Sequence, residues 1–126
     1  MEKERKKILV VDDEPTVLEA VKAALETAHY EVAVAFNGRD GLQMAIGQQP
    51  DLILLDVMMP KMDGFQLLSC LKNDERTKRI PVVMLTAKGE SESIYLSQQL
   101  RAADFLMKPF AVGELLDVVC RYIVKK

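Results

Sequence analysis

The stretch PDLILLDVMMP, residues 50–60, contains an apolar run that ends directly on Asp56. Another apolar run, Ile8–Val11, ends in the same way on Asp12 and Asp13. Short runs of this kind, bounded by turn residues and separated by helix-period segments, are typical of strands buried on both faces of a parallel sheet. The carboxyl ends of such strands meet at one edge of the sheet, where ligands bind. We therefore expect the three carboxylates to converge at that edge.

Two later apolar runs bring different chemical groups to the same edge. Val82–Leu85 ends on Thr86, and Phe105–Met107 ends on Lys108. The expected rim of the sheet therefore combines three carboxylates with one hydroxyl and one ammonium group. Such a combination indicates a functional site.

The remaining segments predict one α/β domain over residues 1–126, with a charged lead-in over residues 1–6. Glu31–Ala35 is expected to be a further strand, with Asn37-Gly38 as the turn after it. Strands that alternate with helices, without an internal linker, predict a doubly wound five-stranded parallel sheet with helices on both faces. The first helix should close on a residue in the left-handed conformation. The first expected helix opens at residues 14–16 and ends near residues 28–30, and the second lies around residues 42–46. Three further helices are expected over residues 65–73, 91–100 and 112–124.

Composition narrows the classes of function. Lys and Arg number 17 against 19 Asp and Glu, and this net charge of -2 gives no electrostatic reason to bind nucleic acid. No apolar stretch is long enough to span a bilayer, and no membrane contact is expected. Cys70 and Cys120 lack metal-ligand spacing and are expected to be buried thiols in a reducing compartment, which favours the cytoplasm. His29, the only histidine, is expected in a turn, and His-rich metal sites are excluded.

The acids after the first strand decide the chemistry of the rim. Phosphate-cradling folds of this class carry glycines there, whereas this chain carries Asp12 and Asp13, so a nucleotide site is not favoured. Crowded carboxylates repel one another, and Mg²⁺ relieves the repulsion while it keeps waters and phosphate oxygens as further ligands. Asp56 stands alone on its strand and is the expected nucleophile toward phosphorus, while the acid pair suits the metal. Thr86 and Lys108 would stabilise the transferred phosphoryl group.

Five motifs, in this order, resemble the receiver domain of two-component response regulators over essentially residues 7–124. The resemblance implies the flavodoxin-like strand order 2-1-3-4-5. It also implies a signalling phosphoacceptor that is not an enzyme beyond its own phosphorylation and dephosphorylation. A phosphatase of the haloacid-dehalogenase type needs a second acid two residues after the nucleophile, where this chain has Met58. The motifs are VVDDEP (10–15), PDLILLDVMMP (50–60), MDG (62–64), PVVMLTA (81–87) and KPF (108–110).

The resemblance further implies roles for the acids of the rim. Asp56 would accept a phosphoryl group from a sensor histidine kinase or a histidine phosphotransfer protein. Asp13, Asp56 and the backbone carbonyl of Met58 would bind Mg²⁺, and Asp12 would act on the metal through water. No other cofactor is expected.

The family pattern also implies a switch. Thr86 and Lys108 would contact the phosphoryl oxygens, Phe105 falls where the family keeps an aromatic switch residue, and the bond between Lys108 and Pro109 would be cis. Phosphorylation would draw Thr86 inward, let Phe105 turn in, and change the surface of helix four, strand five and helix five. Relatives commonly carry Gly in the turn where this chain has Arg101.

The partner is expected to be a protein. Ile94, Tyr95 and Val118 are expected as exposed apolar contacts on the switching surface, which suggests a downstream protein target. The alternative is a receiver fragment of a larger regulator whose missing output domain binds DNA or acts as an enzyme, because a single-domain protein and an excised fragment look alike in sequence. We expect a monomer or a weak phosphorylation-dependent dimer.

Overall fold

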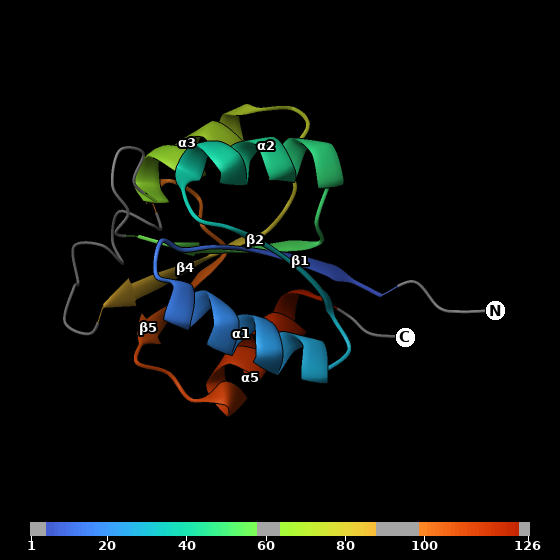
Figure 1. Cartoon of the computed structure of the whole chain (residues 1–126). Coiled ribbons are helices and arrows are strands. Elements are labelled where there is room, and N and C mark those ends of the chain that lie inside the picture. Colours follow the sequence, from blue (N-terminus) through green and yellow to red (C-terminus); the bar gives the residue numbers. More distant parts are fainter. Residues whose placement is uncertain (1–4, 58–63, 88–98, 124–126) are drawn as a thin grey trace.

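Five parallel strands form a sheet in the order β2-β1-β3-β4-β5 within residues 5–57, 64–87 and 99–123, the residues that the computed structural model describes (Figure 1). Each pairing between neighbouring strands is parallel. The predicted doubly wound α/β class and the predicted strand order are therefore confirmed. The strands are β1 (Lys7–Val11), β2 (Glu31–Ala35), β3 (Leu52–Asp56), β4 (Val82–Ala87) and β5 (Asp104–Lys108).

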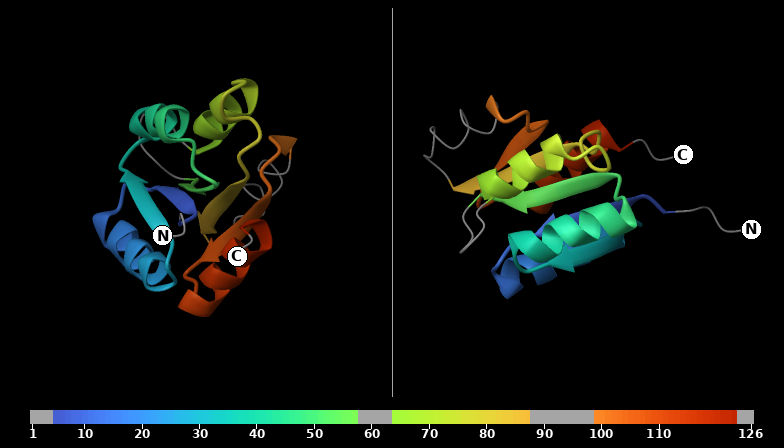
Figure 2. Two further views of the ribbon diagram at one scale, coloured as in Figure 1. Left: turned by 90° about the vertical axis from the view of Figure 1, so that its right-hand side faces the viewer. Right: turned by 90° about the horizontal axis from the view of Figure 1, so that it is seen from above.

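The helices cover both faces of the sheet, as predicted (Figures 1 and 2). α1 (Pro15–Thr27) and α5 (Val112–Tyr122) lie on one face. α2 (Gly38–Gln48) and α3 (Gly64–Asn73) lie on the other. The helix predicted over residues 91–100 falls almost entirely outside the described residues. None of the described helices has the length and apolar character that a membrane span requires.

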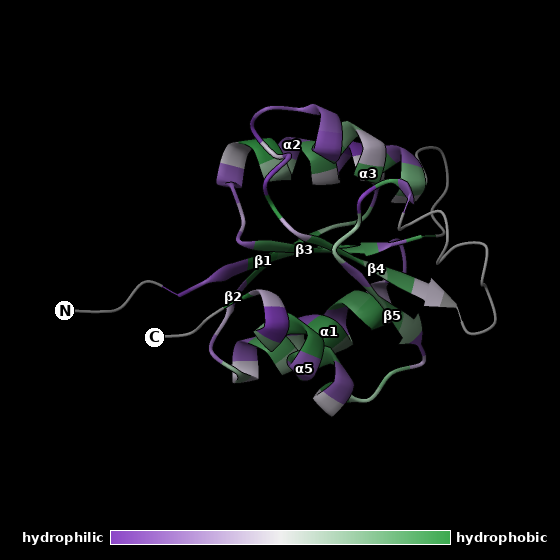
Figure 3. Ribbon diagram, turned by 180° about the vertical axis from the view of Figure 1, so that it is seen from behind, coloured by the Kyte–Doolittle hydropathy of each residue, from purple (hydrophilic) through white to green (hydrophobic). Residues whose placement is uncertain are grey.

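The core is divided in two because consecutive strand residues point to opposite faces of the sheet. On β1, Ile8 and Val10 pack with side chains of α1 and α5, whereas Leu9 and Val11 pack on the side of α2 and α3. Every residue of β3 is buried, which explains why the central strands are continuous apolar runs in the sequence. Figure 3 shows hydrophobic residues concentrated in the sheet and on the helix faces toward it. The packed core therefore fixes the strand ends that carry the polar side chains.

The turns at two helix ends test the sequence predictions. His29, with φ 71°, follows α1 in the left-handed conformation, as predicted. The prediction that Asn37-Gly38 is simply a turn was wrong, because Asn37 caps α2 and Gly38 is the first residue of that helix. The Asn37 side-chain oxygen accepts a hydrogen bond from the Asp40 backbone N–H at 2.8 Å, which satisfies a donor of the first helical turn. Arg101 has φ 69° and so adopts the conformation that glycine takes more easily.

Two predictions of burial were wrong, both on helices. Cys120 is exposed and Cys70 only partly buried, so the cysteines are not the buried thiols that were expected. Val118 is only 5% exposed and belongs to the core, because it shares the inner face of α5 with Leu115 and Val119 at helical spacing. Val118 is therefore not an exposed contact for a partner. Its expected neighbours on that surface, Ile94 and Tyr95, lie outside the described residues.

Candidate functional site

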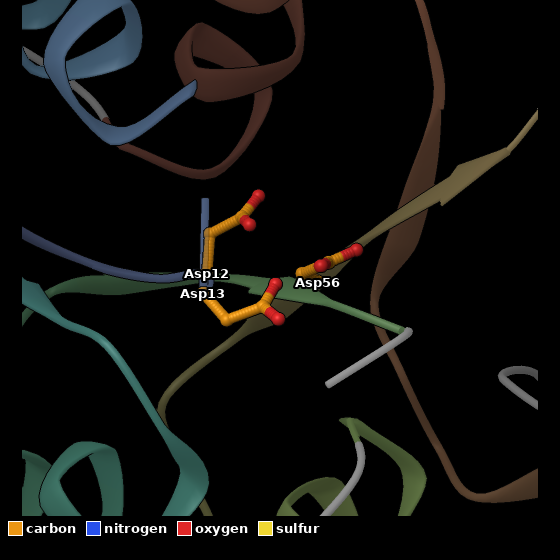
Figure 4. A group of neighbouring side chains, drawn as sticks. All are labelled: Asp12, Asp13 and Asp56. Carbon is orange, nitrogen blue, oxygen red and sulfur yellow. The ribbon is translucent and has the colours of Figure 1, made fainter. Parts of the chain in front are cut away.

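The strand register brings the predicted site residues to one edge of the sheet. The last apolar residues of β1 and β3 pair with each other, so Asp12 and Asp56 follow side by side. The pairing of β4 with its neighbours carries Thr86 and Lys108 to the same edge. Figure 4 shows the side chains of Asp12, Asp13 and Asp56 gathered where β1 and β3 end. The predicted convergence of the acids is confirmed.

The three carboxylates form a crowded and largely buried cluster. One oxygen from each of Asp12, Asp13 and Asp56 lies within 4.8 Å of the others. Asp12 is 0% exposed and Asp56 is 5% exposed, whereas Asp13 is half-buried. At this spacing, two carboxylates repel each other by about 3 to 4 kcal/mol at an effective dielectric constant of about 20. The cluster therefore requires positive charge nearby.

Lys108 supplies part of that charge. Its ammonium nitrogen Nζ donates hydrogen bonds to Asp12 Oδ2 at 3.0 Å and to Asp56 Oδ1 at 3.3 Å. Burial by itself lowers the pKa of Lys108, but the hydrogen bonds and negative charges of Asp12 and Asp56 outweigh it, and the pKa is raised above its ordinary value. Within the described residues, this one ammonium does not balance the three carboxylates, so this part of the site carries a net negative charge that attracts a cation.

The two neighbouring acids that follow β1 are bonded differently. Asp12 Oδ1 accepts a hydrogen bond from the Glu14 backbone N–H at 3.0 Å, while Oδ2 accepts from Lys108. The backbone N–H of Asp12 donates to the Ala35 carbonyl at 3.1 Å, which ties this residue to β2. The Asp13 carboxylate makes no hydrogen bond or ion pair with the described residues. Asp12 is therefore held by the protein, whereas Asp13 offers its oxygens to a ligand.

Thr86 carries a buried hydroxyl that no described residue hydrogen-bonds. The residue is 1% exposed, and its Oγ1 has no hydrogen-bond partner in the part of the chain that the structure describes. A buried hydroxyl left in this state costs about 1–3 kcal/mol. Because Thr86 lies at the rim beside Asp56, a ligand oxygen bound there would supply the missing partner.

Phe105 lies on the strand next to Thr86 and on the same side of the sheet. It pairs in register with Met84 and is partly buried against the core on the side of α2 and α3. Strand alternation directs Thr86 to the side that Met84 faces. The two residues named as a switch therefore share one face. The bond between Lys108 and Pro109 is cis, as predicted.

Two contacts at the rim were not anticipated from the sequence. Glu14 Oε1 lies 3.7 Å from Lys108 Nζ. Gly64 begins α3 so close to β3 that a Cβ atom there would lie 2.2 Å from the Asp56 carbonyl oxygen. In the sequence, the acidic run at residues 12–14 could have indicated the first contact, and the glycine of the MDG motif could have indicated the second. Met58, whose carbonyl was named as a metal ligand, lies outside the described residues.

The donor set fits a hard divalent cation. Carboxylate oxygens are the ligands that Mg²⁺ prefers, and Mg²⁺ keeps waters and phosphate oxygens in its remaining positions. The carboxylates are close enough to share one ion. The Thr86 hydroxyl beside them has no hydrogen-bond partner among the described residues, which leaves it available to a second, oxygen-bearing ligand. The arrangement can therefore place a metal-bound phosphoryl group against Asp56.

Known proteins are similar to this chain in both sequence and fold. The DNA-binding dual master transcriptional regulator RpaA of Synechocystis sp. is 46% identical over 110 residues, which are 87% of this chain and 46% of RpaA. This chain thus spans about half the length of that relative. A putative response regulator from Chloroflexus aurantiacus superposes with a TM-score of 0.92 at 34% identity, covering 97% of this chain and 100% of the other.

A third similar structure holds a metal. It is the receiver domain of a sensor histidine kinase from Pseudomonas aeruginosa PAO1, with a magnesium ion coordinated in its active site cleft. It superposes with a TM-score of 0.89 at 29% identity and covers 97% of this chain and 100% of the other. The sequence profile of the response regulator receiver domain matches residues 8–120. The chain therefore belongs to the family of response regulator receiver domains.

Proposed function

We propose that Asp56 is the residue that accepts the phosphoryl group. The observation that carries this proposal is the position of its carboxylate at the end of the central strand, bonded to Lys108 and within 4.8 Å of two further acids. Asp12 is engaged at both oxygens, which leaves it less suited to attack phosphorus. Receiver domains belong to signalling regulators and are not an enzyme family. The chemistry of this chain would be its own phosphorylation and dephosphorylation.

Receiver domains bind Mg²⁺ at an acidic cluster, and this chain has such a cluster. Asp13, Asp56 and the Met58 carbonyl would hold the ion, and Asp12 would act through water. The engagement of both Asp12 oxygens by Glu14 and Lys108 supports that division. When bound, the metal would neutralise the crowded carboxylates and the charge of the phosphoryl group.

The residues around Asp56 would then act in defined roles. A carboxylate oxygen of Asp56 forms the new bond to phosphorus while the bond from phosphorus to the donor nitrogen of a phosphohistidine breaks. Lys108 exchanges its hydrogen bond with Asp56 for one with a phosphoryl oxygen. The Thr86 hydroxyl donates to another phosphoryl oxygen and so gains a partner, which no described residue provides. These interactions are strongest where negative charge develops on the transferred group.

The output would follow from the movement of Thr86. Its hydroxyl moves toward the phosphoryl group, and Phe105, on the neighbouring strand and the same face, turns inward. Phe105 has no hydroxyl, so neither orientation requires a hydrogen-bond partner. The phosphoryl group would shift an existing equilibrium between two states of the surface formed by helix four, β5 and α5.

The phosphodonor would be a sensor histidine kinase or a histidine phosphotransfer protein, and the receiver would span residues 1–126. A downstream protein or an output domain would read the switching surface. An output domain is favoured by the similarity to RpaA, a DNA-binding regulator that is about twice as long as the segment matched by this chain. The protein would act in the cytoplasm as a monomer or a weak phosphorylation-dependent dimer, without direct contact of this domain with nucleic acid.

The test is chemical labelling of Asp56. The protein is incubated with acetyl phosphate and Mg²⁺, and the modified residue is located by mass spectrometry. We expect the label on Asp56 and none on the Asp56→Asn variant. Label on Asp12 or Asp13 of the wild type, or undiminished labelling of Asp56→Asn, would contradict the proposal.

A further inference from the structure

Glu14 occupies an unusual place at the start of α1. It is the residue that precedes the first helical turn, yet its side chain makes no capping hydrogen bond there. Ser, Thr, Asp and Asn are the residues that cap helices well from this position. The Glu14 carboxylate instead lies 3.7 Å from the ammonium group of Lys108. Its side chain therefore lies toward Lys108 and does not cap the helix.

The three acids around Lys108 differ in how firmly they are held. The side chains of Asp12 and Asp56 are 0% and 7% exposed and accept hydrogen bonds from Lys108. The Glu14 side chain is 60% exposed, and its contact with Lys108 is the longest of the three. Glu14 is therefore the partner of Lys108 that is free to change position.

Glu14 also stands outside the group that shares a cation. The acids able to hold one ion together are Asp12, Asp13 and Asp56. A metal would offset the charges of those three, whereas in the described part of the chain the Glu14 charge is offset only by its ion pair with Lys108. When Lys108 binds a phosphoryl group instead, Glu14 loses its ion pair and lies near an additional negative charge.

We propose that Glu14 is a positioning residue that competes with the phosphoryl group for Lys108 and slows phosphorylation of Asp56. This inference rests on the proposed function of Asp56. In the resting state, Glu14 holds the ammonium toward the α1 side of the site. During phosphoryl transfer Lys108 leaves Glu14, and the unpaired carboxylate repels the anionic donor.

The expected magnitude follows from one unit charge acting over several ångströms. At dielectric constants between that of a protein surface and that of water, removing the charge should raise the rate of phosphorylation by about threefold to tenfold. Because the effect is electrostatic and Glu14 is exposed, salt should suppress it. The Debye length falls to about 3 Å at 1 M ionic strength.

The experiment measures the second-order rate constant for phosphorylation of Asp56 by acetyl phosphate with Mg²⁺, at about 0.05 M and about 1 M ionic strength. Glu14→Gln removes the charge, and Glu14→Asp keeps it. Glu19→Gln is the matched control, because Glu19 is an exposed acid of α1 that makes no ion pair with the described residues. Thermal unfolding checks that all variants fold as the wild type does.

We expect Glu14→Gln to react threefold to tenfold faster than wild type at low salt and less than about twofold faster at 1 M. Glu14→Asp and Glu19→Gln should stay within about twofold of wild type. Equal rates for Glu14→Gln and wild type at low salt, with Asp56 labelled in both, would overturn this inference alone. An equal acceleration by Glu19→Gln, or one that persists at 1 M, would also overturn it. Failure to label Asp56 in the wild type would refute the proposed function and this inference together.

Discussion

Replacement of Gly64 by alanine should destabilise the protein, because α3 begins against the backbone of β3. A Cβ atom at this position would lie 2.2 Å from the Asp56 carbonyl oxygen and 2.8 Å from Val57 Cα. Backbone atoms cannot rotate away, so the start of α3 must shift. Overpacking costs about 1–3 kcal/mol, and loss of the 3.0 Å hydrogen bond from the Gly64 N–H to the Val57 carbonyl adds about 1 kcal/mol. We expect a total loss of about 2–4 kcal/mol.

Two other helical glycines provide matched controls. No atom lies within 4 Å of a Cβ built at Gly47, so Gly47→Ala should stabilise α2 by about 0.5–1 kcal/mol. A Cβ at Gly41 would meet Val11 Cγ2 at 3.0 Å and Leu67 Cδ2 at 3.3 Å. Those atoms belong to side chains that can adjust, so Gly41→Ala should fall between the other two variants.

The assay is urea-induced unfolding, with and without Mg²⁺. The three variants should rank Gly47→Ala, Gly41→Ala and Gly64→Ala in decreasing free energy of unfolding, at similar dependence on urea. Gly64→Ala should also gain less stability from Mg²⁺, because the shifted backbone belongs to Asp56. If Gly64→Ala proves as stable as Gly47→Ala, the close approach of α3 to β3 does not exist and the reasoning fails.

Three further predictions concern the metal, high pH and the switch. Mg²⁺ at a hundredfold excess over its dissociation constant should stabilise the wild type by about 2.7 kcal/mol, and an equal rise in melting temperature for Asp13→Ala would place the metal elsewhere. Burial, with a smaller contribution from Cys120, raises the pKa of Tyr30 to about 12. The folded state therefore favours the neutral phenol. Tyr30 therefore stabilises the folded state fully below about pH 10. This stabilisation, about 2–3 kcal/mol, is lost as the pH rises to about 12. In urea unfolding between pH 9 and pH 12, the free energy of unfolding should decrease less with pH for Tyr30→Phe than for the wild type. An equal decrease in both would exclude Tyr30 as its source. Beryllofluoride, a mimic of aspartyl phosphate, should shift the NMR signals of Phe105 and α5, and changes confined to the loops around Asp56 and Thr86 would refute the proposed output surface.

The strands and the order of the rim residues could be predicted from the sequence because the central strands are buried on both faces. Burial on both faces turns each strand into a continuous apolar run, and the first polar residue after the run marks the strand end. Asp12, Asp56, Thr86 and Lys108 were located in this way, and parallel pairing then required them to meet. His29 was also predictable, since many helices are followed by a residue in the left-handed conformation and no glycine follows α1.

The errors arose where a residue was judged apart from the helix in which, or next to which, it lies. Val118 was expected on the switching surface as an exposed apolar contact, but the spacing of α5 places it on the buried face with Leu115 and Val119. Cys120 is exposed at the edge of the core, where its sulfur lies 3.9 Å from the hydroxyl of the buried Tyr30. Asn37 reads as a turn residue, and the same preference for side-chain-to-backbone bonds makes it a helix cap.

The sequence by itself determined the class of the fold, the set of groups at the rim and the chemistry that they support, because strand ends are encoded by neighbouring residues. The tertiary structure alone decided which oxygens of Asp12 are engaged, which acid holds Lys108 loosely, and how near Gly64 comes to the Asp56 carbonyl. These are distances between segments far apart in the chain. They depend on how the sheet register and the packed helices set the backbone, to within a few tenths of an ångström, which no local pattern of residues specifies.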